Sequence, residues 1–411
     1  MRKNSLNLAA VLLALGLVGC ASGSSGNETT TAFNEQPTET VAKTQEQTEE
    51  ATEAETETEE EKLYSDEMRD ITPMQLVKEM HIGWNLGNTL DSSGTGHGPG
   101  EAPQIFETAW GAQYTSQIQM DKVLEAGYDV IRIPVSWGEH IYDDGKCTID
   151  EAWMDRVQEI VDFVYKRGAY VILNTHHEEW YKTFEDDKEE GKKKIAAVWK
   201  QIGERFADYG DHLIFEGLNE PRKKGTGVEW TGDKEARDVI NEYMQTFVDT
   251  IRGLGGKNAK RCLMITGYAA SSSKNNLAAI KLPEDDHLIV SVHAYIPYNF
   301  ALNKEGTSTW NNDTRDIDEL MKNLDELFIS KGIPVIIGEF GAMNKENLEE
   351  RISWVKYYIS AAKKVGTVCV WWDNHSFSGN GENFGLLHCN GMNITWKYPE
   401  LVTAMVEESR K

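Results

Sequence analysis

The chain has 411 residues, of which 40% are hydrophobic and 27% are charged, a composition typical of a globular protein that is long enough for one large α/β domain. Its formal net charge of −25 at pH 7 argues against nucleic acids and acidic polysaccharides as partners, because a polyanion would be repelled.

Residues 1–20 have the features of an export signal. Arg2 and Lys3 supply positive charge, and residues 8–18 form an apolar run that is short for a permanent membrane span. The run ends in LVGC at 17–20, which resembles the lipobox of bacterial lipoproteins and implies cleavage before Cys20 and attachment of lipid to its sulfur. An ordinary signal peptide with an incidental cysteine is the alternative. We therefore expect an extracellular, lipid-anchored protein on the surface of a bacterial cell.

Residues 21–62 are composed almost wholly of Thr, Glu, Gln, Ser and Ala, and residues 27–62 contain twelve glutamates against two lysines. A segment with so little apolar surface cannot offset the entropy lost on ordering. We expect a disordered, self-repelling linker that separates the membrane anchor from one folded domain at residues 63–411.

Four cysteines follow Cys20, and none of them forms a CxxC pair, so a zinc or redox site is not indicated. Cys262 and Cys369 lie within apolar runs and are expected to be buried thiols. The sequence does not show whether these two, Cys147 or Cys389 form disulfides.

The folded part alternates short apolar runs with longer amphipathic stretches. The apolar runs are continuous, as expected for strands covered on both faces of a parallel sheet. Eight strands are predicted, at residues 81–85, 130–134, 170–175, 213–218, 261–266, 288–293, 334–338 and 367–372. Helices are predicted at 117–126, 151–167, 192–209, 234–254, 317–331 and 347–365, with a closing helix near 399–409. This order indicates either a doubly wound sheet or a (β/α)8 barrel, the TIM barrel fold.

The position of the polar residues favours the barrel. In a (β/α)8 barrel the carboxyl ends of all strands meet on one face, and that face holds the active site. Nearly every predicted strand here ends in polar or aromatic residues: Asn85 and Asn88, Arg132, His176 and His177, Asn219 and Glu220, His293 and Tyr295, Glu339, and Trp372. No Gly-rich phosphate loop follows the first strand, which excludes a nucleotide-binding doubly wound fold.

Two glutamates stand out at these strand ends. Glu220 and Glu339 each follow an apolar strand and are flanked by Gly or Pro. Cleavage of a glycosidic bond needs two carboxyl groups, one protonated to assist the leaving oxygen and one ionised to attack or stabilise the sugar. Arg132 is expected to favour the ionised form of one of them. A structural ion pair at the barrel end is the alternative.

Several motifs occur together in an order that resembles glycoside hydrolase family 5, a retaining family of (β/α)8 hydrolases. The resemblance covers essentially residues 68–409. The matching motifs are GWNLGNT at 83–89, VIRIP at 130–134, LNEP at 218–221, HAY at 293–295, GEFG at 338–341 and WWDN at 371–374.

The resemblance implies a role for each matching residue. Glu220 corresponds to the acid/base, Glu339 to the nucleophile and Arg132 to the arginine that keeps the nucleophile ionised. The remaining positions correspond to residues that bind the sugar or support the two carboxylates: Asn88, His176, His177, Asn219, His293, Tyr295 and Trp372.

No cofactor is expected. His176 and His177 could suggest a metal, but adjacent strand residues should point to opposite faces, and no Asp or Cys lies at ligand spacing, so no metal site is predicted. Glu178 and Glu179 are interpreted as loop carboxylates without a catalytic role. Glu216 is expected to point away from the site toward a structural partner.

Within the family, WNLGNTLD at 84–91 followed by ETAWG at 107–111 resembles the broad subfamily of endoglucanases, lichenases and xyloglucanases, although Ala112 and Gln113 replace its usual Asn-Pro. The resemblance implies an endo-β-1,4-glucanase that acts on β-glucan, with a xyloglucanase or β-mannanase as the alternative and an inactive glycan-binding lipoprotein as a remote one. We expect a monomer. The Gly- and Asn-rich segment 376–383 is predicted to be a loop over the cleft.

Overall fold

The computed structural model describes residues 63–411, so the predicted signal segment, the lipidation site Cys20 and the linker lie outside the described residues. Eight parallel strands close into a barrel in chain order, β1 to β8, and β1 pairs with both β2 and β8. The strands are β1 Gly83–Leu86, β2 Val130–Ile133, β3 Tyr170–Asn174, β4 Leu213–Glu216, β5 Leu263–Ser271, β6 Leu288–His293, β7 Val335–Phe340 and β8 Val368–Asp373. The predicted (β/α)8 barrel is confirmed.

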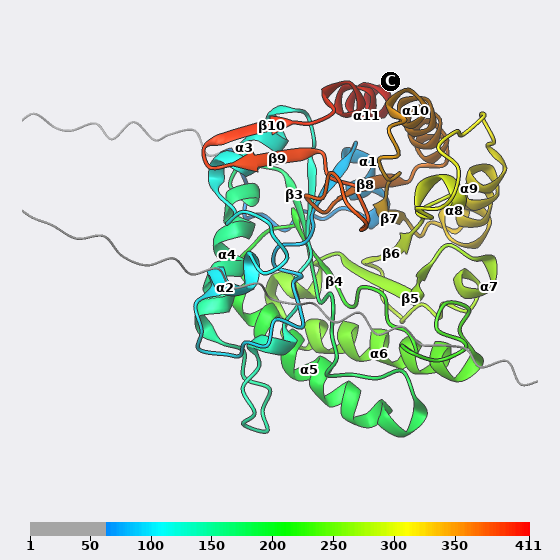
Figure 1. Cartoon of the computed structure of the whole chain (residues 1–411). Coiled ribbons are helices and arrows are strands. Elements are labelled where there is room, and N and C mark those ends of the chain that lie inside the picture. The colour runs from blue at the N-terminus through cyan, green and yellow to red at the C-terminus, as the bar shows by residue number, and fades with distance from the viewer. Residues whose placement is uncertain (1–62) are drawn as a thin grey trace, which may run out of the picture. The chain divides into compact units, whose positions relative to one another are not determined.

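Helices cover the outside of the barrel, as Figure 1 shows, with α5 beside α6 at one edge and α10 beside α11 at another. They bury one apolar stripe each against the outward-facing side chains of the strands, which explains why the strand sequences are apolar on both faces. The long helices are α3 Gln117–Glu125, α4 Glu151–Tyr165, α5 Lys188–Arg205, α6 Lys234–Gly253, α9 Arg315–Leu327, α10 Leu348–Val365 and α11 Pro399–Arg410.

The amino-terminal end of the barrel is closed by α1 Pro73–Glu79, a helix that was not predicted. Thr72 and Gln75 form a capping box, and Pro73 occupies the first turn, so the sequence does contain a helix start signal. Leu76 and Val77 pack against the inward-facing residues of the strands. Because α1 closes this end, the open face of the barrel is the opposite end, where the strands finish.

The element boundaries differ from the prediction in several places. Helix α5 begins at Lys188 rather than 192, and β5 runs on to Ser271. An unpredicted hairpin, β9 Leu387–Asn390 and β10 Asn393–Trp396, precedes α11. Gly391, with φ of +59°, occupies the first position of its two-residue turn, a known hairpin signal. Three short helices also lie in loops: α2 Pro103–Glu107, α7 Lys274–Leu277 and α8 Tyr298–Ala301.

The cysteines of the described region, Cys147, Cys262, Cys369 and Cys389, are all free thiols. Cys262 and Cys369 are buried, as their apolar surroundings predicted. Between residues 63 and 411, no helix combines the length and the apolar character that a membrane crossing requires.

Candidate active site

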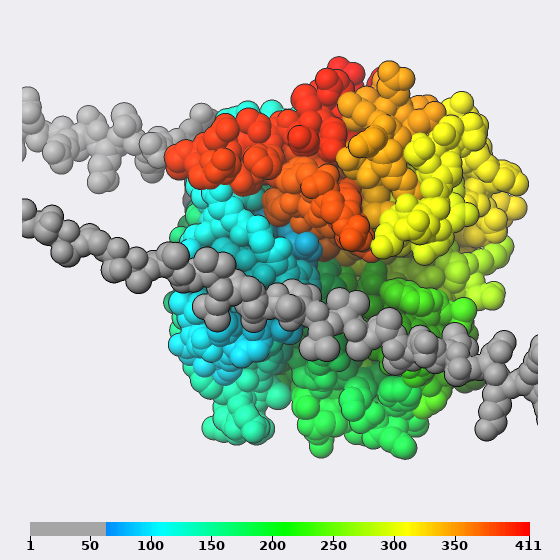
Figure 2. Space-filling view, viewed as in Figure 1, coloured from blue at the N-terminus to red at the C-terminus, as the bar shows by residue number. Residues whose placement is uncertain are grey.

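Glu220 and Glu339 lie together on the open face of the barrel, at the ends of β4 and β7. Figure 2 shows a hollow between the orange segments and the green segments of the folded domain. Glu220 lies in the loop after β4, and Glu339 is the second-to-last residue of β7. Oxygen atoms of the two carboxylates and a ring nitrogen of His293 all lie within 4.8 Å of one another. The two carboxylates are therefore near neighbours, as the retaining mechanism requires of its nucleophile and acid/base.

His293, the last residue of β6, bridges the two carboxylates. Its Nδ1 lies 2.8 Å from Glu220 Oε1 and 3.5 Å from Glu339 Oε2. Because three ionisable groups are this close, they exchange protons as a unit rather than as independent residues.

Arg132 is buried beneath Glu220, Glu339 and His293, and its guanidinium hydrogen-bonds to the side chains around it. Its Nη1 donates to Glu339 Oε1 at 2.9 Å, and its Nε donates to Glu216 Oε2 at 2.7 Å. Nη1 and Nη2 also donate to the side-chain oxygens of Asn85 and Asn219, at 3.0 and 2.7 Å. The guanidinium therefore fixes the positions of four side chains from the ends of three strands, β1, β4 and β7.

Glu216 corrects one prediction. It does have structural partners, but it does not point away from the site: it lies fully buried directly under Arg132 and also accepts a hydrogen bond from Asn174 Nδ2 at 3.0 Å. It is the last residue of β4, four positions before Glu220, and strand alternation places it on the same inward face as Ile214, which packs inside the barrel. Its buried charge stabilises Arg132 and, through Arg132, the position of Glu339.

The electrostatic environments of the two glutamates differ. Burial raises the pKa of Glu339, and the nearby charge of Glu220 adds to this rise, while His293, Arg132 and the hydrogen bond from Tyr295 act against it. Burial alone would raise the pKa of Glu220, but the hydrogen bond and charge of His293, together with the charge of Arg222, lower it. The pKa of His293 is raised despite its burial, through Glu339 and Glu220. The three groups therefore titrate together, and the charge of His293 favours the ionised form of each carboxylate.

The remaining predicted residues surround this centre. Tyr295 donates its hydroxyl to Glu339 Oε2 at 2.8 Å. Trp372, at the end of β8, packs with Phe384, and its ring lies parallel to that of His176 with centroids 5.7 Å apart. Asn219 Nδ2 lies 3.3 Å from His176 Nε2. These side chains surround the carboxylate pair at the open face of the barrel.

His177 also faces the cleft. The expectation that His176 and His177 point to opposite faces, which was part of the argument against a metal site, is therefore wrong. The rings of His176 and His177 meet edge to face with centroids 4.4 Å apart, because both residues lie beyond the last residue of β3, where strand alternation no longer holds. A carboxylate oxygen of Asp91 lies within 4.8 Å of a nitrogen of each. Asp91 Oδ2 and Oδ1, however, already accept the backbone N–H groups of Asn88 and Thr89.

Asn88 stands in the turn after β1, directly after Gly87, which packs against Trp372. It has a positive φ of 56°, which Asn tolerates better than most residues. A side chain at its neighbour Gly87 would come within 3.0 Å of the Trp372 ring, so only glycine allows the turn to pack there. Asp91 stabilises this turn, a role that the sequence analysis did not identify.

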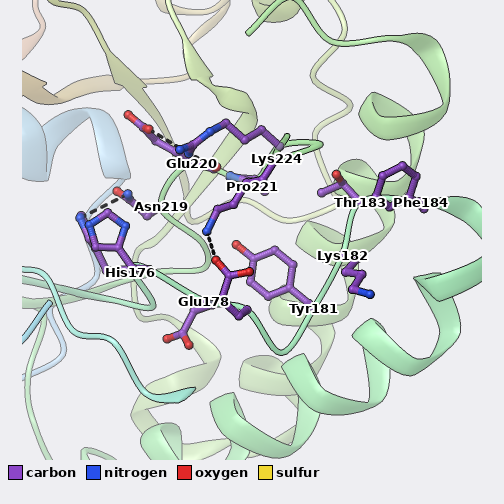
Figure 3. Close-up of a pocket in the computed structure, with 13 residues that line it drawn as sticks. His176, Glu178, Tyr181, Lys182, Thr183, Phe184, Asn219, Glu220, Pro221 and Lys224 are labelled. Carbon is purple, nitrogen blue, oxygen red and sulfur yellow. Dashed lines mark hydrogen bonds and ion pairs between the residues drawn. The ribbon is translucent and has the colours of Figure 1, made fainter. Parts of the chain in front are cut away.

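Beside the acidic centre is a cavity of about 280 Å³, shown in Figure 3. Glu220, Pro221 and Lys224 line one side of it, and Tyr181 and Phe184 line the other. Glu178 lies at its base and is buried, accepting the backbone N–H groups of Trp137 and Gly138, and burial raises its pKa to about 7. Glu179 is exposed and pairs with Lys224. Neither residue contacts the carboxylate pair, in agreement with their interpretation as non-catalytic loop residues.

The segment 376–383 lies next to the site, as its composition predicted. Asn374 Nδ2 donates to the carbonyl oxygen of Glu382 at 2.8 Å, which ties the segment to the end of β8. Phe384 packs against Tyr295 with ring centroids 5.3 Å apart. Burial raises the pKa of Glu382, and the charges of Glu339 and Glu220 add to the rise. The segment therefore forms part of the rim of the cleft.

A closed parallel barrel with two neighbouring carboxylates at the ends of β4 and β7, an arginine beneath them and an aromatic platform beside them defines a (β/α)8 glycoside hydrolase. Comparison with known proteins identifies the family. Residues 91–378 match the family model for cellulase, glycosyl hydrolase family 5. The chain is 54% identical over 341 residues to Endoglucanase 1 of Ruminococcus albus, covering 82% of both proteins.

Solved structures agree with this assignment. A GH5-4 broad specificity endoglucanase from Ruminococcus champanellensis with bound cellotriose has a TM-score of 0.80 and 47% identity, covering 82% of this chain and 99% of that one. A GH5 family lichenase from Caldicellulosiruptor sp. F32 has a TM-score of 0.78 and 42% identity, covering 84% and 98%. The chain belongs to glycosyl hydrolase family 5, as its motifs predicted.

Proposed function

We propose that this protein is a retaining endo-β-1,4-glucanase that cleaves internal bonds of cellulose-type and mixed-linkage β-glucans. The observation that carries the proposal is the short separation of Glu220 and Glu339 above Arg132. The relatives named as endoglucanases and lichenases support the choice of substrate. The aromatic ring of Trp372 fits the apolar C–H face of a glucose unit, and the neutral amide and imidazole groups around it suit uncharged hydroxyl groups.

In the first chemical step, Glu339 Oε attacks the anomeric carbon while the bond from this carbon to the leaving oxygen breaks. Glu220 transfers its proton to that oxygen, so the shortened chain leaves as a neutral alcohol. Arg132 and Tyr295 each donate a hydrogen bond to the Glu339 carboxylate, which acts against the effect of burial and favours the ionised form that attacks.

In the second step, a water molecule attacks the anomeric carbon of the glycosyl-enzyme. Glu220 accepts the proton of the water, and the bond to Glu339 breaks, which restores the carboxylate. Glu220 serves as acid and then as base because its neighbour changes charge. Once Glu339 is esterified, its negative charge no longer repels a charge on Glu220, so the pKa of Glu220 falls.

A panel of polysaccharides tests the proposed substrate. Release of reducing ends from carboxymethyl cellulose and lichenan, with a rapid fall in viscosity, supports the proposal. Preferred action on xyloglucan or glucomannan would instead favour the alternatives of a xyloglucanase or β-mannanase. The alternative of an inactive glycan-binding protein predicts no release from any of them, and the complete set of contacts around Glu339 and Arg132 argues against it.

We also propose that the enzyme is displayed on the bacterial surface as a lipoprotein, anchored through Cys20 and separated from the membrane by residues 21–62. The LVGC motif at 17–20 supports this. We propose that it acts as a monomer, since one chain supplies every residue of the site. Cys20→Ala should move the protein from the membrane fraction to the soluble fraction without changing its specific activity. Continued sedimentation with membranes would contradict the anchor.

A further inference from the structure

Arg351 is a buried arginine whose guanidinium has no hydrogen-bond partner in the described chain. It lies near the start of α10, and none of its surface is accessible. Among residues 63–411, no atom accepts a hydrogen bond from any of its three guanidinium nitrogens. A guanidinium carries five N–H donors, and burial of a charged group without acceptors is strongly unfavourable. A group that accepts these hydrogen bonds is therefore expected beside Arg351.

The positive charge of Arg351 persists at neutral pH. Burial lowers the pKa of Arg351 to about 10, which leaves the guanidinium protonated at pH 7. Its guanidinium carbon lies 5.7 Å from the centroid of the Trp371 ring and 4.9 Å from that of the Tyr398 ring, so two aromatic rings compensate part of the charge. Aromatic rings are weak hydrogen-bond acceptors, so the N–H groups still need stronger ones.

Asp373 is the acidic residue whose charge acts on Arg351, but the two side chains do not form an ion pair. The Asp373 carboxylate is fully buried and already engaged. Its Oδ2 accepts the indole N–H of Trp84 at 3.0 Å and the two backbone N–H groups of residues 386–387 at 3.0 and 2.9 Å. Its Oδ1 accepts the backbone N–H of His375 at 3.0 Å. Asp373 therefore offsets the charge of Arg351 from a distance and accepts none of its N–H groups.

Arg261 shows how the same chain satisfies another buried arginine. Arg261 is also fully buried, lies over an aromatic ring, that of Phe215, at 4.8 Å, and has its pKa lowered to about 10 by burial. Its guanidinium donates to five oxygen atoms, one from the side chain of Asn258 and four from backbone carbonyl groups, at 2.8–3.1 Å. Arg351 has the same burial and similar aromatic contacts but none of these acceptors. The comparison points to an acceptor for Arg351 that comes from outside the chain.

We infer that Arg351 binds a chloride ion, held beside the start of α10 and the rings of Trp371 and Tyr398. A halide meets both requirements, because it accepts hydrogen bonds from several N–H groups and supplies the missing negative charge. A water molecule would leave the charge uncompensated, and a phosphate or sulfate would bring a second charge that is costly to bury. Trp371 packs against Trp354 of α10, with ring centroids 6.4 Å apart, so the ion lies on the helix-covered side of β8. The inference goes beyond the proposed function and does not depend on the substrate.

Thermal unfolding of the purified full-length enzyme tests whether chloride binds. Sodium chloride replaces sodium gluconate at constant ionic strength, because gluconate is too large to enter a fully buried site. An ion that binds only the folded state raises Tm as its concentration rises. A chloride concentration one hundred times Kd corresponds to about 2.7 kcal/mol, which for a domain of this size is a rise in Tm of about 4 °C. Bromide should act as chloride does.

Arg351→Met removes the charge and keeps an unbranched side chain. We expect the Tm of this variant to be independent of chloride and, without chloride, to be at least as high as that of the wild type, because an unpaired buried charge is gone. Arg261→Met is the matched control, since the hydrogen bonds of Arg261 are all made within the chain. Its Tm should be lower at every chloride concentration but should rise with chloride as in the wild type. An equal rise in Arg351→Met, or no rise in the wild type, would overturn the inference.

Bromide soaked into crystals of the wild-type enzyme locates the ion, and this measurement decides the question even where Arg351→Met does not fold. Anomalous scattering should show one bromide within hydrogen-bonding distance of the Arg351 guanidinium. A water molecule at that position under saturating bromide, with bromide found only at the protein surface, would mean that solvent satisfies Arg351 and would contradict the inference. None of these measurements uses a glycan, so failure of the proposed glucanase activity would not affect their outcome.

Discussion

Replacing Arg132 by methionine removes the only positive charge that contacts both Glu216 and Glu339 in the described structure. Both carboxylates are almost completely buried, at 0% and 7% side-chain exposure. Methionine fills much of the same space, so the variant tests the charge rather than the packing. It leaves two buried carboxylates without their shared partner.

The expected cost follows from the cost of breaking a buried ion pair on one side, about 3–5 kcal/mol of unfolding free energy. For a domain of this size, such a loss lowers Tm by about 4–7 °C. A second substitution, Glu216→Gln, removes one of the two unpaired charges while keeping the shape and the hydrogen bond from Asn174. Arg132→Met with Glu216→Gln should therefore recover at least half of the lost stability.

Activity should behave differently from stability. Glu339 loses its charged donor in both variants, so kcat should fall at least about 100-fold in each, even where the fold is restored. Urea unfolding gives the free energies, and initial rates on a soluble glucan give kcat. A loss of less than about 1 kcal/mol in Arg132→Met, or no recovery in the double variant, would refute the reasoning that Arg132 compensates two buried charges.

Three further predictions concern protons and leaving groups. Glu220→Ala should no longer cleave glucan but should still react with an activated aryl cellobioside, and azide should rescue its second step to give the β-glycosyl azide. Glu339→Ala should lose activity on both substrates. If the two variants exchanged these behaviours, the two roles would be reversed. Arg222→Gln removes a charge that lowers the pKa of Glu220, so the alkaline limb of kcat/KM, where the acid loses its proton, should move to higher pH; an unchanged limb would contradict this effect. Burial lowers the pKa of His140 to about 3, so below pH about 6.5 the unfolded chain binds a proton that the folded chain does not. The unfolding free energy of the wild type should then fall by about 1.4 kcal/mol per pH unit, relative to that of His140→Phe, on acidification toward pH 4. Parallel curves of unfolding free energy against pH would contradict this effect of His140.

The barrel and its carboxylate pair could be predicted from the sequence because their signals are local. Each strand is a continuous apolar run, and each polar strand end follows from the convergence of parallel strands on one face. The same reasoning missed α1 and the β9–β10 hairpin, although Thr72 with Gln75 and Gly391 at the first position of the hairpin turn carry recognisable signals. Short elements contain too few residues to show a clear hydrophobic period, so they are harder to predict than the long helices and strands.

Other features of the site could not be read from the sequence because they depend on side-chain direction at strand ends. Glu216 was expected to point outward and instead supports Arg132. His176 and His177 were expected to diverge and instead meet, with Asp91 beside them. The contact of Arg222 with Trp230 joins residues eight positions apart through an irregular loop, which no periodic pattern describes.

The central claim is that this enzyme works by double displacement, with Glu339 as nucleophile and Glu220 as acid/base. Incubation with 2,4-dinitrophenyl 2-deoxy-2-fluoro-β-cellobioside slows release of the sugar from the enzyme, and mass spectrometry of the protein and its peptides then locates the bound sugar. Our account predicts one fluorocellobiosyl group per chain, attached to the peptide that contains Glu339, and no adduct in Glu339→Ala. Attachment to the peptide that contains Glu220, or turnover of the compound without any covalent adduct, would contradict it.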